Sequence, residues 1–167
     1  MTHRELDKLL ALVIAQAKAI KIPVSDRICP QVRVNRRART RFGCCIRRDG
    51  AYTIELSALL AREGSEDAVL QVLAHEVLHT CYGCSNHGAR WKGYAQRMNA
   101  ACGFHISRTD NHQALGLPDD RPVRYWVVCT RCGHKIPRMK RSPLVDHPER
   151  YRCKCGGALR VENNIER

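Results

Sequence analysis

The residues best suited to chemistry are two histidines and a glutamate in the pentapeptide His75-Glu76-Val77-Leu78-His79. Side chains four residues apart on an α-helix lie on one face, about 6 Å apart along the axis, so both imidazoles can approach one zinc ion. The glutamate directly after the first histidine stands where zinc peptidases place a general base. A buried structural histidine pair would have the same spacing, so the rest of the chain has to decide between these interpretations.

A predicted helix carries this pentapeptide. Ser65 is a suitable N-cap residue, and Glu66 and Asp67 would lie in the first turn, where the helix dipole favours negative charge. The apolar positions of the helix are Val69, Val72, Leu73 and Val77. If these side chains pack against a sheet, the two histidines and Glu76 face a cleft.

A third zinc ligand has to come from further along the chain, because a catalytic site uses three protein ligands and leaves one position open. The next histidine is His87. On a continuing helix it would lie about 12 Å beyond His79, too far for ligands that each lie about 2 Å from one ion. We therefore predict that the chain turns back through Gly83, which tolerates left-handed backbone, and that Ser85 or Asn86 caps a second helix near His87.

Four cysteines near the C-terminus predict a second, structural metal site. They form two pairs, each preceded by strand-like residues and followed by glycine: Cys129 with Cys132, and Cys153 with Cys155. This pattern is typical of a zinc ribbon, in which four thiolates hold the metal tetrahedrally. Such a domain has little core, so the metal should supply much of its folding energy.

The elements that position these residues predict an α+β fold in two domains. Residues 1–106 would form a small domain with an N-terminal helix ended by Pro23, a small antiparallel sheet with a turn at Asp49-Gly50, the helix of the pentapeptide and a following helix ended by Gly103. Residues 107–124 are polar and lack a sustained period, so we expect a linker. Residues 125–167 would form the β zinc ribbon.

Length and composition indicate a folded, soluble protein. The chain has 167 residues, of which 44% are hydrophobic, enough for one ordinary domain and a small second one. No segment approaches the roughly 18 to 20 apolar residues of a membrane span, and the charged N-terminal segment lacks the apolar part of a signal peptide. We therefore expect a cytoplasmic protein without a membrane partner, in a reducing compartment where its ten cysteines can bind metal.

The chain is strongly basic, with a formal net charge of +13. This balance points to a polyanion as partner. The phosphates of a nucleic acid bind basic surfaces with release of counterions, so we expect DNA. Two basic clusters would contact it, one before the hairpin and one in the ribbon: Arg36, Arg37, Arg39, Arg41, Lys135, Arg138, Lys140 and Arg141. Trp126 and Tyr151 would suit stacking on single-stranded or distorted DNA. The alternatives are a solvated sheet face and a ribbon that only supports the first domain.

The order of these motifs resembles that of the SprT-like or Spartan zinc metallopeptidases. The matching segments are 32–35, 39–43, 54–57, 75–79 and 87–91, and the resemblance covers essentially the whole chain, including its tail. It implies that His75, His79 and His87 bind a catalytic zinc and that Glu76 is the general base on the zinc-bound water. With the ribbon, the expected cofactors are two zinc ions, one catalytic and one structural.

The segment between His79 and His87 is shorter than in many members of that family, which leaves the path of the turn open. It contains Cys81 and Cys84, which have ribbon-like spacing but no partner pair nearby in sequence. We interpret them as packing residues, with a reversible disulfide as the alternative.

We therefore expect a zinc endopeptidase that cleaves proteins bound or crosslinked to DNA. The alternatives are a non-catalytic, zinc-containing DNA-binding adaptor and a general cytosolic metallopeptidase without a DNA role. An intact Glu76 argues against the adaptor, since a purely structural site does not need a carboxylate beside its ligands. Tyr82, Tyr94 and Arg90 are the candidates for stabilising the oxyanion.

Overall fold

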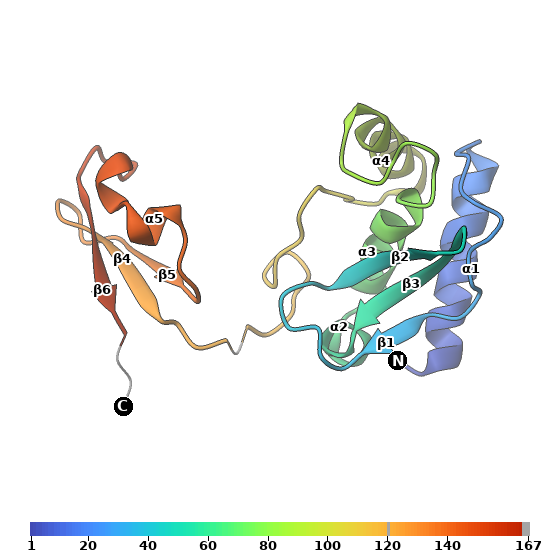
Figure 1. The fold of residues 1–167 in the computed structure, drawn as a ribbon, viewed down its shortest axis with the longest axis horizontal. Coiled ribbons are helices and arrows are strands. Elements are labelled where there is room, and N and C mark those ends of the chain that lie inside the picture. Colours follow the sequence, from blue (N-terminus) through green and yellow to red (C-terminus); the bar gives the residue numbers. More distant parts are fainter. Residues whose placement is uncertain (120, 165–167) are drawn as a thin grey trace. The chain divides into compact units, whose positions relative to one another are not determined.

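The structure, a computed structural model, describes residues 1–119 and 121–164. The chain divides into two compact units, Met1–Pro118 and Asp119–Arg167 (Figure 1). Residues 107–118, which the sequence assigned to the linker 107–124, belong to the first unit, because Leu115 and Leu117 are buried in its core. Asp120 of that linker and residues 165–167 of the predicted ribbon lie outside the described residues.

Helix α1 (His3–Ala19) begins the first unit. A capping box fixes its N-terminus, since the Glu5 N–H donates to the Thr2 hydroxyl and the Thr2 N–H donates to the Glu5 carboxylate. Its buried residues lie on one face at the helical spacing that the sequence predicted, and this face packs against α3 (Glu66–Leu78): Leu6, Leu10, Val13 and Ala17.

The sheet of the first unit is mixed. Strands β2 (Gly43–Arg48) and β3 (Ala51–Ser57) form the predicted hairpin, and its turn residues Asp49 and Gly50 both have positive φ, 51° and 75°. Strand β1 (Arg33–Asn35) pairs in parallel with the other edge of β3, so the prediction of a wholly antiparallel sheet is wrong for β1. The connection after β1 carries the chain to the far edge, and the hairpin then returns β3 between the two strands. The resulting order, β1-β3-β2, leaves β2 at an edge.

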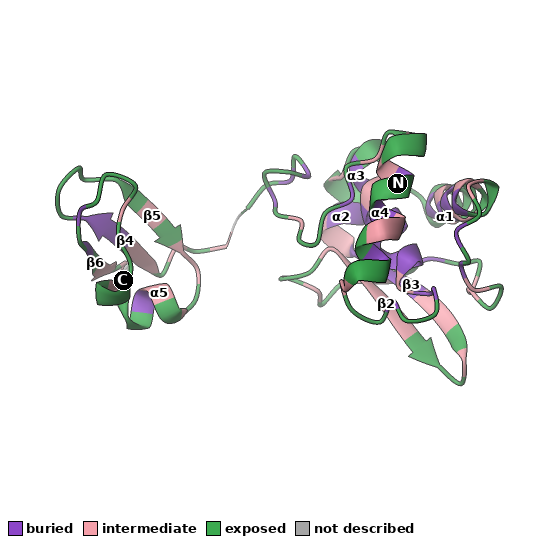
Figure 2. Ribbon diagram, turned by 90° about the horizontal axis from the view of Figure 1, so that it is seen from above, coloured by how far each residue is buried: buried purple, intermediate pink, exposed green. Residues whose placement is uncertain are grey.

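Two serine caps start the helices that follow the sheet. Ser57 accepts the N–H of Leu60 at the start of α2 (Ala58–Glu63), and Ser65 accepts the N–H of Ala68 at the start of α3, as predicted for that helix. Helix α3 is buried along most of its length and packs against α1 and the sheet (Figure 2). Helix α4 (Ala89–Cys102) packs against α3 and ends at Gly103, as predicted, and the φ of 71° at this glycine is left-handed.

The second unit is a small antiparallel sheet with short helical turns. Its strands are β4 (Tyr125–Cys129), β5 (Lys135–Arg138) and β6 (Leu159–Asn163), in the order β5-β4-β6. Helix α5 (Pro143–Asp146) and the 3-10 turn η1 (Pro148–Arg150) come between β5 and β6 in the chain. Its core is small and is built on Val127, Cys129, Val145 and Leu159. The two units together confirm the predicted α+β class.

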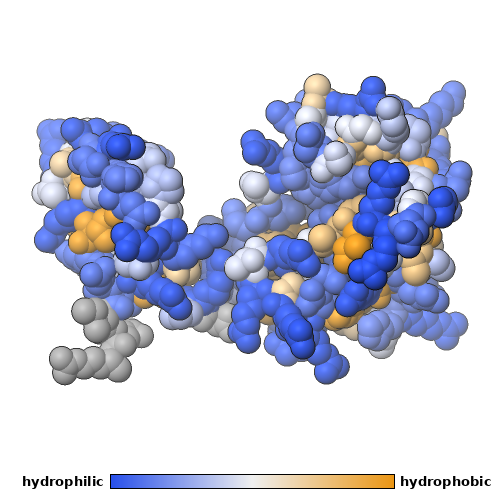
Figure 3. Space-filling view, in the orientation of Figure 1, coloured by the Kyte–Doolittle hydropathy of each residue, from blue (hydrophilic) through white to orange (hydrophobic). Residues whose placement is uncertain are grey.

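The surface of both units is largely polar on the face drawn in Figure 3. In the described part of the chain, none of the helices combines the length and the apolar character that a bilayer span requires.

Candidate active site

Three imidazoles converge in the first unit. His75 and His79 come from the last turn and the C-cap of α3, and His87 comes from the loop before α4. The Nε2 atom of His75 lies 3.3 Å from that of His79 and 2.9 Å from that of His87, and the Nε2 atoms of His79 and His87 lie 3.2 Å apart. Nitrogen ligands of one tetrahedral zinc lie about 3.3 Å apart, so the spacing suits a single ion.

The outer nitrogens of two of these rings face backbone carbonyls. His75 Nδ1 lies 2.9 Å from the Ser107 oxygen, and His79 Nδ1 lies 2.7 Å from the Cys84 oxygen. A carbonyl can only accept, so each Nδ1 carries the proton and each neutral ring presents its Nε2 lone pair to the others. Lone pairs this close repel unless a cation lies between them. Histidines that bind zinc usually donate the N–H of their other ring nitrogen to a carbonyl or carboxylate, as these two do. The donor set therefore fits zinc.

Trp91 of α4 lies against all three imidazoles. Its ring centroid is 4.7 Å from that of His75, 5.7 Å from that of His79 and 4.6 Å from that of His87, and its side chain is buried. Burial, together with the nearby charges of His79 and His87, lowers the pKa of His75 to about 4, and burial also lowers the pKa of His87. Both rings are therefore neutral at pH 7, the form that binds metal.

Glu76 lies beside the histidines and is only 8% exposed. Burial raises its pKa to about 7, although the backbone N–H of Cys45 and the charge of Arg41 act in the opposite direction. The carboxylate contacts the edge strand closely, because a Cβ atom at Gly43 would lie 2.7 Å from Glu76 Oε1. A carboxylate with a pKa near neutral can both accept and return a proton.

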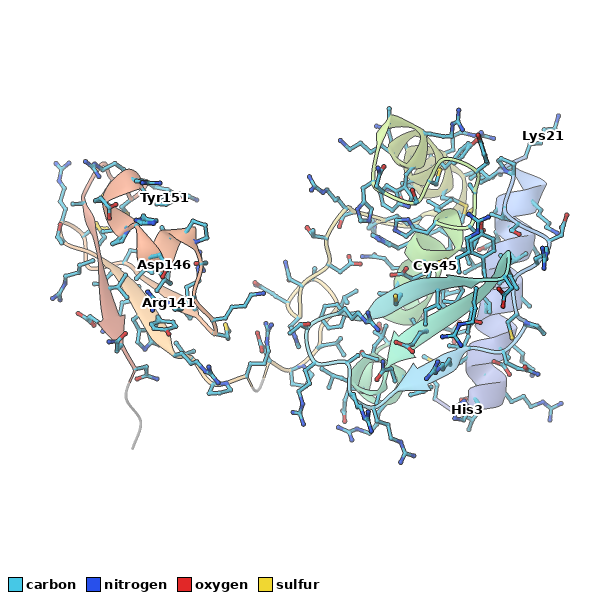
Figure 4. All side chains as sticks on the ribbon, viewed as in Figure 1. His3, Lys21, Cys45, Arg141, Asp146 and Tyr151 are labelled. Atoms are coloured by element: carbon cyan, nitrogen blue, oxygen red, sulfur yellow. The ribbon has the colours of Figure 1, made fainter. Side chains whose placement is uncertain are left out.

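An open cleft of about 940 Å³ exposes these groups. Strand β2 forms one wall, where Figure 4 labels Cys45, and the loop between His79 and His87 forms another. The wall-forming residues include Gly43, Cys44, Cys45, Arg47, Tyr52, Tyr82 and Asn86. A cleft of this size can take an extended segment of a larger molecule.

A sequence model of the SprT-like family matches residues 16–112, more than half of the chain and the part that contains the three histidines and Glu76. The chain belongs to the SprT-like family. No curated protein sequence matches it. The first unit is thus a metallopeptidase-like, zincin-like domain, and the C-terminal cysteines lie outside the matched residues.

The chain of the SprT-like domain turns back through Gly83, as predicted, and the φ of 73° at this residue is left-handed. The capping prediction is wrong in detail, because α4 begins at Ala89 after the N-cap Gly88, which has no side-chain cap. Asn86 instead accepts the Gly88 N–H and shapes the loop that presents His87. Among the candidates for oxyanion stabilisation, Tyr82 is 88% exposed on the cleft wall, with Arg90 stacked on its ring and bonded to its carbonyl.

Other contacts of the SprT-like domain's site had no signal in the sequence. The carbonyls of Ser107 and Cys84 are backbone groups, which any residue could supply. The segment after Ser107 also borders the site, since Asp110 accepts from Gln71 of α3 and raises the pKa of Glu76. Cys81 and Cys84 are buried free thiols in the core, as packing residues would be.

The four C-terminal cysteines form a second candidate metal site. Their sulfur atoms all lie within 4.8 Å of one another, with Cys129 Sγ 3.5 Å from Cys155 Sγ and Cys132 Sγ 3.6 Å from Cys153 Sγ. The edge of a tetrahedral zinc–thiolate site is about 3.8 Å. The Cys132 and Arg131 N–H groups donate to Cys129 Sγ and lower the pKa of this thiol to about 6. The cluster is consistent with zinc.

The predicted DNA-binding residues are mostly exposed, but not all are free. Arg41 pairs with the buried Glu55 at 2.8 Å, and Arg141 pairs with Asp146 at 2.7 Å (Figure 4). Arg138 is half-buried and donates to the Pro137 carbonyl. In the described part of the chain, the side chains of Arg36, Arg37, Arg39, Lys135 and Lys140 are exposed and form no ion pair.

Proposed function

We propose that the protein is a zinc-dependent endopeptidase that acts on proteins bound or crosslinked to DNA. The observation that carries the peptidase proposal is the convergence of three histidine Nε2 atoms beside the buried Glu76 on an open cleft. When bound, zinc would polarise a carbonyl and lower the pKa of water. His75, His79 and His87 would hold this ion.

The chain's own groups would bind the peptide and move the proton. Strand β2 pairs with β3 along one edge, and its other edge borders the cleft, where an extended peptide can add as a further strand. The Glu76 carboxylate accepts the proton of the attacking water and passes it to the leaving amine. Its raised pKa suits both transfers.

The nucleic-acid part of the proposal is supported by charge. The chain has 29 lysines and arginines against 16 acidic residues. Arg36, Arg37 and Arg39 lie together in one exposed segment of the SprT-like domain, and Lys135 and Lys140 are exposed in the second unit. Phosphate contacts of this kind bind DNA without reading its sequence and would bring the peptidase to DNA-bound substrates.

The test compares the wild type with Glu76→Gln in cleavage of a DNA-binding protein, with and without single-stranded DNA, alongside zinc content. We expect two zinc ions per chain in both forms and a loss of cleavage by about 100-fold or more in the variant, the usual contribution of a general base. Equal cleavage by the two forms would reject the peptidase. Cleavage that DNA does not stimulate would favour the general metallopeptidase.

The DNA role has its own variants. Changing Arg36, Arg37 and Arg39 together to Gln should weaken DNA affinity and reduce its dependence on salt. The matched control changes Arg4 and Lys8, exposed basic residues of α1, to Gln. Full DNA affinity in the first variant, or equal losses in both, would show that the 36–39 segment is not a specific contact. If neither the wild type nor Glu76→Gln cleaves the substrate but the wild type binds DNA, the adaptor is the better function.

A further inference from the structure

Arg47 is the only lysine or arginine among the described residues that line the cleft, and Glu76 is the only carboxylate there. The Arg47 side chain lies over the ring of Tyr52, with its guanidinium carbon 5.8 Å from the ring centroid. Among the described residues, no carboxylate pairs with it. An exposed cation without a charged partner, on the wall of a binding cleft, is available to a ligand.

Tyr52 gives this arginine a fixed support. The Tyr52 N–H donates to the Arg27 carbonyl at 2.8 Å, and the Tyr52 carbonyl accepts from the Cys29 N–H at 2.7 Å. Tyr52 also stands opposite Arg47 in the register of β2 and β3. A guanidinium held over a fixed ring loses less freedom when it binds an anion.

The edge of β2 that does not pair with β3 places Arg47 relative to Glu76. The Ser57 N–H donates to the Phe42 carbonyl, so in the antiparallel register the backbone groups of residues 43, 45 and 47 point away from β3. Their side chains share the face directed at α3, since a Cβ at Gly43 would meet Val72 and Glu76. Cys45 donates its N–H to Glu76, and Arg47 lies two residues further along the same edge, about 7 Å away.

We propose that Arg47, supported by Tyr52, forms a subsite that selects an acidic side chain in the peptide substrate. The proposal rests on the proposed peptidase function. A peptide added to the β2 edge places one residue beside Cys45, next to Glu76, and the residue two positions away beside Arg47. A Glu or Asp there neutralises Arg47, whereas a Lys is repelled. The edge strand favours a polypeptide over a DNA strand, because its backbone groups match those of a peptide.

The test uses the zinc-loaded full chain. A cleavage site is first mapped in reduced casein, and peptides spanning it are made with Glu, Gln or Lys two residues from the residue at the cleaved bond, on each side in turn. The wild type should cleave the Glu peptide about two- to fivefold better in kcat/KM than the Gln peptide on one of the two sides, the range of an exposed ion pair. Arg47→Ala should remove this preference, and Arg47→Glu should shift it towards Lys.

Arg48→Ala is the matched control. Arg48 is the neighbouring exposed arginine, and its side chain points to the opposite face of β2, so this variant should keep the preference of the wild type. A ranking of the three peptides that is the same in Arg47→Glu and the wild type would overturn the subsite. A loss of the preference in Arg48→Ala as large as the loss in Arg47→Ala would also overturn it.

Binding separates failure of the subsite from failure of the peptidase. Fluorescence anisotropy with labelled casein-derived peptides of one fixed sequence that carry either Glu or Lys at a single position, measured on Glu76→Gln with and without Arg47→Glu, reports the charge preference even if the wild type cleaves nothing. Loss of single-stranded DNA affinity in Arg47→Ala, with unchanged discrimination between the peptides, would assign this arginine to DNA and reject the acidic subsite.

Discussion

Gly43 lies so close to Glu76 that a Cβ atom added to the glycine would be 2.7 Å from the Oε1 atom of the glutamate. The same Cβ would lie 2.7 Å from a methyl group of Val72 on α3. Real Cβ atoms essentially never approach other atoms this closely, so any larger residue at this position would displace the side chain of Glu76 or Val72. The close approach also brings the Cys45 N–H to the carboxylate.

The first prediction is that Gly43→Ala impairs catalysis while the metal stays bound. The new methyl group would push the Glu76 carboxylate from its place, and a misplaced general base loses much of its effect. We expect cleavage to fall by about 10- to 100-fold with two zinc ions per chain retained.

Gly93→Ala is the matched control, because nothing lies within 4 Å of the position of its Cβ in α4. That change should be neutral or should stabilise the helix by about 0.5–1 kcal/mol. Equal activity of the two variants would contradict the prediction.

Local chemistry explains how much of this site the sequence could predict. Ser65 caps α3, Gly83 has left-handed backbone and Gly103 ends α4, as the sequence predicts, since these preferences depend only on neighbouring residues. The common face of His75 and His79, at the C-terminal end of α3, follows from helical periodicity in the same way.

Contacts between distant segments explain what the sequence could not predict. The parallel pairing of β1 depends on where the chain returns, which no local pattern encodes. Leu115 and Leu117 are isolated apolar residues in a polar stretch, so the local pattern predicts a linker and gives no sign that they pack against the core. The Ser107 carbonyl that orients His75 lies beyond α4 in the chain, 32 residues from this histidine.

The second prediction concerns the ring beneath the three imidazoles. Trp91→Ala removes a buried ring from contact with His75, His79 and His87, so it should lower both the free energy of unfolding, by about 3–5 kcal/mol, and the affinity for zinc. Trp91→Phe keeps an aromatic ring and should lose less of both. Competition with a chromophoric chelator measures the zinc affinity.

Met98→Ala is the control for the loss of core volume. Met98 is fully buried on α4, seven residues beyond Trp91 in the chain. Its replacement should cost about 2–5 kcal/mol of stability without a matching loss of zinc affinity. If the Trp91 and Met98 variants lose zinc affinity equally, Trp91 acts only through general stability.

The third prediction uses the raised pKa of Glu76 in the chain after removal of metal by a chelator. The folded pKa of about 7 exceeds the usual value of 4.5, so the folded state keeps a proton that the unfolded state releases between these values. The stabilising effect of this proton is complete below pH 4.5 and is lost as the pH rises through 7. Glu76→Gln should therefore match the wild type near pH 4.5 and exceed its free energy of unfolding by about 3 kcal/mol at pH 8.

Urea unfolding followed by Trp91 fluorescence, in a Trp126→Phe background, measures this difference within the SprT-like domain. Added zinc should reduce the advantage of Glu76→Gln, since a nearby cation favours the carboxylate. An advantage that is constant between pH 4.5 and pH 8 would show that burial of the charged carboxylate is not its origin.

The fourth prediction is that the second unit depends on its own metal. Its hydrophobic core is built on only four buried residues, so we expect a bound zinc to supply much of the free energy that offsets the conformational entropy of folding. Cys132→Ser removes one of the four clustered thiols and should lower the zinc content, measured by native mass spectrometry, from two ions to one. Hydrogen exchange should then show loss of amide protection in β4, β5 and β6, while α3 keeps its protection.

Cys102→Ser, a change of a half-buried thiol outside both clusters, should leave both measurements unchanged. Retention of two ions in Cys132→Ser, or protected strands in a chain with one ion, would mean that this sheet is stable without a structural zinc.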